Sequence, residues 1–139
     1  MSFEKLAVLG AGAIGSTIGA YLTRAGRDIT LIDLWPAHVE EMRRGGLKVT
    51  AQDEEFTVKV KALHLTDVCT LRERFDAVVL SVKSYDSVWA ATFIEPYLAS
   101  SAVLISAQNG INEERVAALA GRERCLGCVI TIGAGMYEP

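Results

Sequence analysis

The sequence has 139 residues, of which 50% are hydrophobic and 22% are charged, and its formal net charge is −3 at pH 7. This length suits a single domain, and the hydrophobic content excludes a disordered tail or linker. The net negative charge argues against a nucleic-acid-binding surface, and no apolar run approaches the roughly 18 residues that span a bilayer.

The N-terminal third of the sequence alternates between strand and helix patterns. The apolar run 6–9 predicts a strand that is buried on both faces. Apolar residues then recur at helical spacing, which predicts a helix over 14–25, and residues 29–33 predict a second strand. A further helix is predicted from Pro36 to Gly45. Because strand–helix–strand crossovers are right-handed, the two strands should be parallel neighbours.

The remainder of the sequence begins less regularly and then resumes this alternation. Residues 47–50 and 56–65 alternate between apolar and polar side chains, which predicts a peripheral hairpin, and a short helical turn is predicted over 69–74. The further predicted elements are strands over 77–80, 103–105 and 126–132 and helices over 85–94 and 112–120. Together these elements predict an α/β fold in a single domain, residues 1–139. We expect a Rossmann-type, doubly wound and mostly parallel sheet with helices on both faces.

A glycine-rich loop follows the first predicted strand. Its residues match the pattern G-x-G-x-x-G and are Gly10, Ala11, Gly12, Ala13, Ile14 and Gly15. In a dinucleotide-binding loop, the first glycine permits a tight turn, the second lets a pyrophosphate approach the backbone, and the third lets the helix pack closely on the sheet. The start of that helix also offers unpaired N–H groups to the phosphates. The context of buried strand and amphipathic helix favours this interpretation over a tight turn without a ligand, and all six residues are predicted to bind the cofactor.

The second predicted strand ends at Asp33. A carboxylate at this position can accept hydrogen bonds from the hydroxyls of an adenosine ribose. It would repel a 2′-phosphate, and the next residues, Leu34 and Trp35, supply no positive charge to offset that repulsion. Asp33 therefore favours NAD over NADP. An alternative role for Asp33 is to cap the helix predicted from Pro36.

Two more polar residues follow predicted strands. Ligands of open α/β sheets bind beyond the carboxyl ends of the strands, so Lys83 and Asn109 are candidates for contact with cofactor and substrate. A lysine could contact phosphate, ribose or a substrate carboxylate, and an asparagine could donate to a carbonyl or hydroxyl. The alternatives are a solvated lysine that opens a helix and a turn asparagine in the left-handed conformation.

The cysteines and histidines predict no metal site or catalytic group. Cys125 and Cys128 form a single C-x-x-C pair on an apolar strand, which indicates buried structural thiols, and a zinc site would need further ligands. His38 falls on a predicted surface helix and His64 in the predicted hairpin. Neither histidine is therefore an attractive acid for carbonyl reduction.

Taken together, these segments resemble the N-terminal domain of the ketopantoate reductase (2-dehydropantoate 2-reductase) family. The resemblance is carried by residues 10–15, 81–86, 107–111 and 128–135 and covers essentially the whole chain. Enzymes of that family reduce ketopantoate to pantoate with a nicotinamide cofactor, a step toward pantothenate and coenzyme A. The resemblance implies a 2-oxo-acid substrate and implies that Lys83 and Asn109 face the cofactor and substrate.

The sequence departs from the family pattern in two places. Family members generally use NADPH and carry a basic residue after the second strand, where this sequence has Asp33. We therefore expect an NAD(P)H site, with NADP implied by the resemblance and NAD favoured by Asp33. The family also continues into a helical C-terminal domain that holds its catalytic lysine, and this sequence stops at Pro139. We expect a fragment with no catalytic residue of its own, which binds the cofactor and is inactive alone.

Several alternatives stay open at this point. The chain could be a non-catalytic NAD(H)-binding or redox-sensing module, a reductase for a different 2-oxo acid, or a flavin-binding half-domain. No nucleic-acid or membrane partner is expected. Exposed apolar residues near 132–137 favour a homo-oligomer. The N-terminus lacks a signal peptide's basic start and apolar centre, which predicts a cytoplasmic protein.

Overall fold

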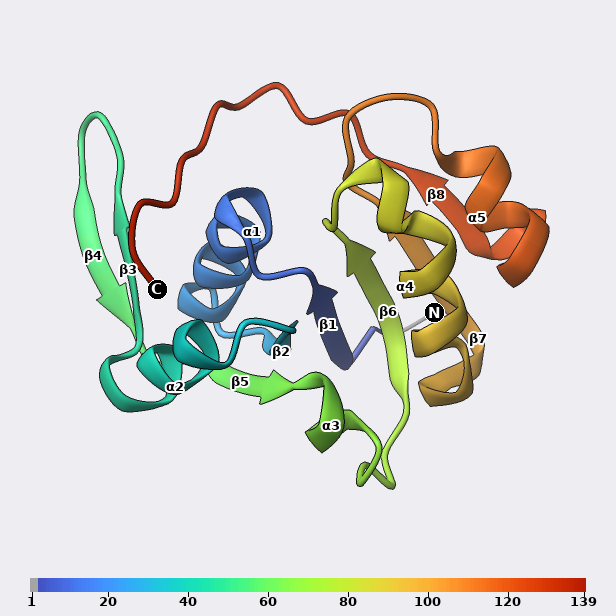
Figure 1. The fold of residues 1–139 in the computed structure, drawn as a ribbon, viewed down its shortest axis with the longest axis horizontal. Helices are drawn as coiled ribbons and strands as arrows, with labels where there is room; N and C mark the ends of the chain where they lie inside the picture. Colours follow the sequence, from blue (N-terminus) through green and yellow to red (C-terminus); the bar gives the residue numbers. More distant parts are fainter. Residues whose placement is uncertain (1–2) are drawn as a thin grey trace.

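A computed structural model of the chain describes residues 3–139 and contains one six-stranded sheet and a separate two-stranded hairpin (Figure 1). The strands of the large sheet lie in the order β5-β2-β1-β6-β7-β8, and every neighbouring pair is parallel. Their bounds are Lys5–Leu9 (β1), Asp28–Asp33 (β2), Lys61–His64 (β5), Phe75–Leu80 (β6), Leu98–Ser106 (β7) and Cys125–Gly127 (β8). The hairpin pairs β3 (Leu47–Thr50) with β4 (Glu55–Val58) in antiparallel fashion.

Helices connect the strands and cover both faces of the sheet. The α-helices are α1 (Ala13–Arg24), α2 (Pro36–Gly45), α3 (Leu65–Val68), α4 (Ser87–Ile94) and α5 (Glu113–Ala120), and short 3-10 turns span Ser84–Asp86, Glu95–Tyr97 and Arg122–Arg124. Neighbouring residues of β2 show the two faces. Leu31 packs in a cluster with residues of α1 and α2, whereas Ile32 packs in a cluster with residues of α4 and α5. The predicted doubly wound α/β fold is confirmed.

The hairpin of β3 and β4 packs on α1 rather than on the sheet. The ring of Tyr21 meets the ring of Phe56 edge to face, with 5.1 Å between centroids. Glu54, at the hairpin turn, accepts hydrogen bonds from Tyr21 and Arg24, each at 2.7 Å. The predicted hairpin therefore exists, but its second strand is shorter than expected.

The region predicted as one strand over 56–65 is two strands. Its first part is β4, and its second part, β5, pairs in parallel with β2 in the large sheet. An alternating pattern predicts a half-buried strand without naming its partner, so the sequence did not separate the two pairings. The helical turn predicted over 69–74 was also wrong. The helix begins at Leu65, because His64 and Asp67 form a reciprocal cap at its start.

The last predicted strand, 126–132, is shorter than expected. β8 ends at Gly127, and residues 128–139 contain neither helix nor strand. The N–H of Cys128 donates to the carbonyl oxygen of Ser106 at 2.8 Å. Ser106 is the last residue of β7, so β8 has no further strand residues to pair with beyond this point. The segment 128–139 passes over the carboxyl ends of the strands and ends beside the hairpin (Figure 1). Within residues 3–139, no helix is long and apolar enough to cross a membrane.

Candidate functional site

The glycine loop connects β1 to α1 at the carboxyl edge of the sheet. Gly10 has a φ of +97°, and its N–H donates to Ile32 at 2.9 Å. A Cβ on Gly10 would lie 2.7 Å from the nitrogen of Val82, and a Cβ on Gly15 would lie 2.0 Å from the carbonyl oxygen of Gly10. Side chains essentially never approach backbone atoms this closely. Both positions therefore require glycine for the internal packing of loop, helix and sheet.

Gly12 differs from the other two glycines of the loop. Its φ is −70°, which any residue adopts, and a Cβ there would meet no heavy atom within 4 Å. Gly12 is the N-cap of α1, and the first turn of that helix carries no side-chain cap and no acidic residue. The positive end of the helix is thus uncapped by any side chain, and the space beside Gly12 is open, which fits the approach of a phosphate group.

Side chains hold the carbonyl groups of the loop. Ser81 Oγ donates to the Gly10 carbonyl oxygen at 2.7 Å, and Ser16 Oγ donates to that of Ala11 at 2.7 Å. His38 also reaches the Ala11 carbonyl, with its Nε2 at 2.8 Å. His38 lies on α2, a helix with one exposed face as predicted, but its side chain is on the buried face and points under the loop.

Asp33 lies half-buried at the end of β2, next to the glycine loop. Its Oδ1 accepts the N–H of Trp35 at 2.8 Å, which shapes the turn between β2 and α2. The N-cap of α2 is Trp35, so the alternative in which Asp33 caps this helix does not hold. Within residues 3–139, Oδ2 of Asp33 has no hydrogen-bond partner and remains able to accept hydroxyl groups.

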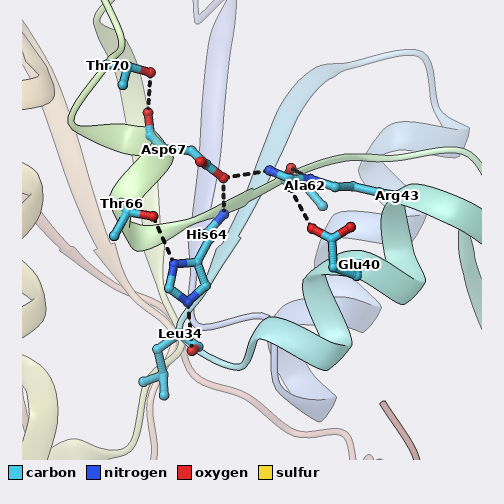
Figure 2. Close-up of polar contacts among 8 residues, drawn as sticks. All are labelled: Leu34, Glu40, Arg43, Ala62, His64, Thr66, Asp67 and Thr70. Atoms are coloured by element: carbon cyan, nitrogen blue, oxygen red, sulfur yellow. Dashed lines mark hydrogen bonds and ion pairs between the residues drawn. The ribbon is translucent and has the colours of Figure 1, made fainter.

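The turn that follows Asp33 is contacted by His64, the last residue of β5, and Asp67 of α3 in turn holds His64 (Figure 2). His64 Nε2 donates to the carbonyl oxygen of Leu34 at 3.1 Å. Asp67 accepts both the His64 N–H, at 2.9 Å, and a guanidinium N–H of Arg43, at 2.6 Å. The Arg43 hydrogen bond, followed by that of the His64 N–H, holds the pKa of Asp67 below its usual range. His64 therefore lies at the end of a sheet strand, in register with Asp33, and not in the hairpin as predicted.

Lys83 and Asn109 lie in the loops after β6 and β7, at the same edge of the sheet. Both residues are exposed. Lys83 takes part in no ion pair among residues 3–139, so its ammonium group is open to an anionic ligand. Gly110, with a φ of +89°, adopts the left-handed conformation at this turn, whereas Asn109 does not. The alternative of a left-handed asparagine was therefore wrong.

A buried amide ties these two loops together. Gln108 Nε2 donates to the carbonyl oxygen of Val82 at 2.8 Å and to Ser87 Oγ at 2.9 Å. Asn112, also buried, donates through Nδ2 to the carbonyl oxygen of Asn109 at 3.0 Å. Sequence reasoning assigned no role to Gln108 or Asn112. The available signal was a glutamine at the end of an apolar strand, where a buried polar group needs partners.

Cys125 is the first residue of β8, and Cys128 directly follows this strand. Both thiols are half-buried, whereas the sequence predicted buried thiols. Cys69, Cys125 and Cys128 are free thiols. Burial, and to a lesser degree the charge of Glu113, raises the pKa of the Cys125 thiol. A raised pKa disfavours the reactive thiolate, in agreement with a structural role.

A parallel, doubly wound sheet with this glycine loop after its first strand and a carboxylate at the end of its neighbour defines a Rossmann-type domain. The chain belongs to the ketopantoate reductase PanE/ApbA family, whose family model matches residues 6–139.

Comparison with individual proteins agrees with this assignment. The chain is 37% identical over 136 residues to the 2-dehydropantoate 2-reductase of Pyrococcus abyssi, covering 97% of this chain and 42% of that protein. The crystal structure of a PanE/ApbA family ketopantoate reductase from Ralstonia eutropha JMP134 superposes with a TM-score of 0.86 at 34% identity, covering 97% of this chain and 44% of the other. A 2-dehydropantoate 2-reductase from Geobacter metallireducens GS-15 gives the same TM-score of 0.86 at 31% identity, with the same coverage of 97% and 44%. The chain thus spans less than half the length of these relatives.

Proposed function

We propose that this chain is the cofactor-binding portion of an NAD(P)H-dependent 2-oxo-acid reductase, namely a 2-dehydropantoate (ketopantoate) 2-reductase that makes pantoate. The observation that carries the proposal is the open backbone face at Gly12, between two glycines that internal packing requires. Membership of the ketopantoate reductase family and the names of the relatives support the choice of substrate.

The site residues take separate roles in this proposal. The loop residues Gly10, Ala11, Gly12, Ala13, Ile14 and Gly15 bind the pyrophosphate through backbone N–H groups and the start of α1. Asp33 accepts hydroxyl groups of the adenosine ribose. Lys83 and Asn109 lie beyond the ends of β6 and β7 and bind the nicotinamide end and the substrate carboxylate. The nicotinamide, when bound, supplies the hydride.

Asp33 favours NADH over NADPH in this proposal. A charge-assisted hydrogen bond from a ribose hydroxyl contributes roughly 1.5–3 kcal/mol, and a 2′-phosphate would lose it and meet a negative charge. The neighbouring Leu34 and Trp35 are exposed and carry no charge, so they do not offset that repulsion. We expect at least about tenfold tighter binding of NADH.

Calorimetric titration of the 139-residue chain with NADH and with NADPH tests the proposal. Gly12→Val is the matched variant, because its side chain would enter the open space at Gly12 without touching the packing of Gly10 or Gly15. We expect this variant to fold and to lose nearly all dinucleotide binding. Retained affinity in the folded variant would remove the glycine loop from the binding site, and equal or tighter NADPH binding would mean that Asp33 does not contact the ribose.

The groups that we place at the strand ends suit binding better than proton transfer. An asparagine is no practical proton donor, and Lys83 is expected to hold the substrate carboxylate. Loss of a positioned general acid typically costs about 10²–10⁴-fold in rate. We therefore expect negligible turnover of ketopantoate by these 139 residues, and ordinary turnover of about 1–10³ s⁻¹ would contradict this. Homo-oligomerisation and a cytoplasmic location remain predictions.

A further inference from the structure

His38 lies beneath the glycine loop and contacts it directly. The residue comes from the first turn of α2, and only 3% of its surface is exposed. Its Nε2 is 2.8 Å from the carbonyl oxygen of Ala11. Because a carbonyl oxygen only accepts, Nε2 must carry the proton and donate this bond. His38 thus places a buried donor at the middle of the loop.

The carbonyl of Ala11 is held by two donors, His38 Nε2 and Ser16 Oγ. In a trans peptide, the C=O of one residue and the N–H of the next point in opposite directions, and residues 3–139 contain no cis peptide bond. Fixing the Ala11 oxygen toward His38 therefore turns the N–H of Gly12 to the other side of the peptide. That N–H donates to no acceptor among residues 3–139. It is available to a ligand that approaches the loop.

The second ring nitrogen of His38 argues against a purely structural role. Nδ1 is buried and has no hydrogen-bond partner among the described residues. An unpartnered buried polar atom is unfavourable, and an apolar side chain of similar size would fill the same space without it. The bond from Nε2 to the loop is what distinguishes histidine from such a side chain.

We propose that His38 is a positioning residue for dinucleotide binding, in which its Nε2–H holds the Ala11–Gly12 peptide so that the Gly12 N–H faces the pyrophosphate. This inference rests on the proposed function, because it concerns the same glycine loop. The ring of Trp35 lies against the ring of His38, with centroids 5.9 Å apart, and the Trp35 N–H donates to Asp33. The segment that connects β2 to α2 and begins α2 therefore contacts both the glycine loop and the Asp33 carboxylate, which we assign to the ribose.

Two variants separate the donor from the ring. His38→Phe keeps an aromatic ring beside Trp35 and removes the donor. His38→Gln removes the ring but keeps a donor. The amide nitrogen of glutamine is separated from Cβ by the same number of bonds as Nε2 of histidine. Loss of one hydrogen bond corresponds to roughly 2- to 10-fold in affinity. We expect His38→Phe to bind NADH about five- to tenfold more weakly than the unchanged chain, and His38→Gln to bind it within about twofold.

Ser16→Ala provides a second test that does not depend on how the pocket accepts phenylalanine. It removes the other donor to Ala11, and we expect about two- to fivefold weaker NADH binding. Calorimetric titration with NADH gives the affinities, and thermal unfolding of the same samples confirms that each variant is folded.

The outcomes distinguish the inference from the proposed function. If the unchanged chain binds NADH and both His38→Phe and Ser16→Ala bind it equally well, the positioning role is overturned and the proposed function stands. Weaker binding by His38→Gln than by His38→Phe also overturns it, because the ring rather than the donor would then matter. If the unchanged chain itself binds neither NADH nor NADPH, the proposed function fails and the inference fails with it.

Discussion

The glycine loop after β1 and the loops after β6 and β7 lie at the same edge of the sheet, but they are held in different ways. The glycine loop depends on backbone contacts so close that Gly10 and Gly15 admit no side chain. The other two loops depend on buried polar side chains, chiefly Gln108, which joins them. Close backbone packing requires glycine at fixed spacing, which is recognisable in the sequence. A polar network is built from residues far apart in the sequence, and only the structure shows that they interact.

The largest effect should come from Gly15→Ala. The new Cβ would lie 2.0 Å from the carbonyl oxygen of Gly10 and 2.5 Å from Ser81 Oγ, so β1, α1 and β6 would have to separate. We expect the free energy of unfolding to fall by about 3 kcal/mol or more. Gly12→Ala is the matched control and should change it by about 1 kcal/mol or less, because only the helix cap is affected. Denaturant unfolding measures both, and equal losses would contradict the distinction between the glycines.

Among the residues of the loops after β6 and β7, substitution of Gln108 should lower the free energy of unfolding most. Gln108→Met keeps the length of the side chain but leaves the Val82 carbonyl oxygen without this donor and the buried Ser106 hydroxyl without its acceptor. Buried groups left unpaired in this way cost about 1–3 kcal/mol, and we expect a loss of about 2 kcal/mol in unfolding free energy. Asn109→Ala alters an exposed neighbour and should stay within about 0.5 kcal/mol. A neutral Gln108→Met would show that the loops are held by other contacts.

A smaller effect, on binding rather than stability, is expected from Asp33→Asn. The asparagine Oδ1 can still accept the N–H of Trp35, so the turn should persist. Removal of the charge should lower the preference for NADH over NADPH by about tenfold, or 1.4 kcal/mol. Paired titrations with the two cofactors measure this ratio, and an unchanged ratio would place the ribose away from Asp33.

The smallest expected effect is on the stability of the fold at acidic pH, through Asp67. The pKa of Asp67 is lowered chiefly by the hydrogen bond from Arg43, so its carboxylate stabilises the fold above its unfolded pKa of about 3.9. That contribution is lost as the pH falls below this value through the lower pKa of the folded state. Arg43→Met should raise the pKa of Asp67 toward its ordinary value, which carboxyl chemical shifts can follow. An unchanged pKa would mean that Arg43 does not interact with Asp67 in solution. The turn after Asp33 would then be held by His64 without support from Arg43.

The sequence was sufficient for the fold class and for the glycine loop, because apolar periodicity and close backbone packing are local properties. It placed His38 on a surface helix but did not show that the side chain lies on the buried face, where Nε2 donates to the Ala11 carbonyl oxygen. It also did not separate β4 from β5, since pairing partners lie far away in the chain. The roles of Asp33, Lys83 and Asn109 toward a ligand remain predictions, because their side chains act on a group outside the chain.

The strand order also governs how the chain can fold. β1 lies between β2 and β6, and β6 begins only at Phe75. The Asp76 carboxylate accepts the N–H groups of Glu4 and Lys5 across this pairing. During synthesis, β1 can pair early with β2, but its other edge stays open until β6 has left the ribosome. Such long-range parallel pairing slows folding and exposes an apolar strand edge to other chains, so we expect slow refolding and a need for dilute conditions or chaperones.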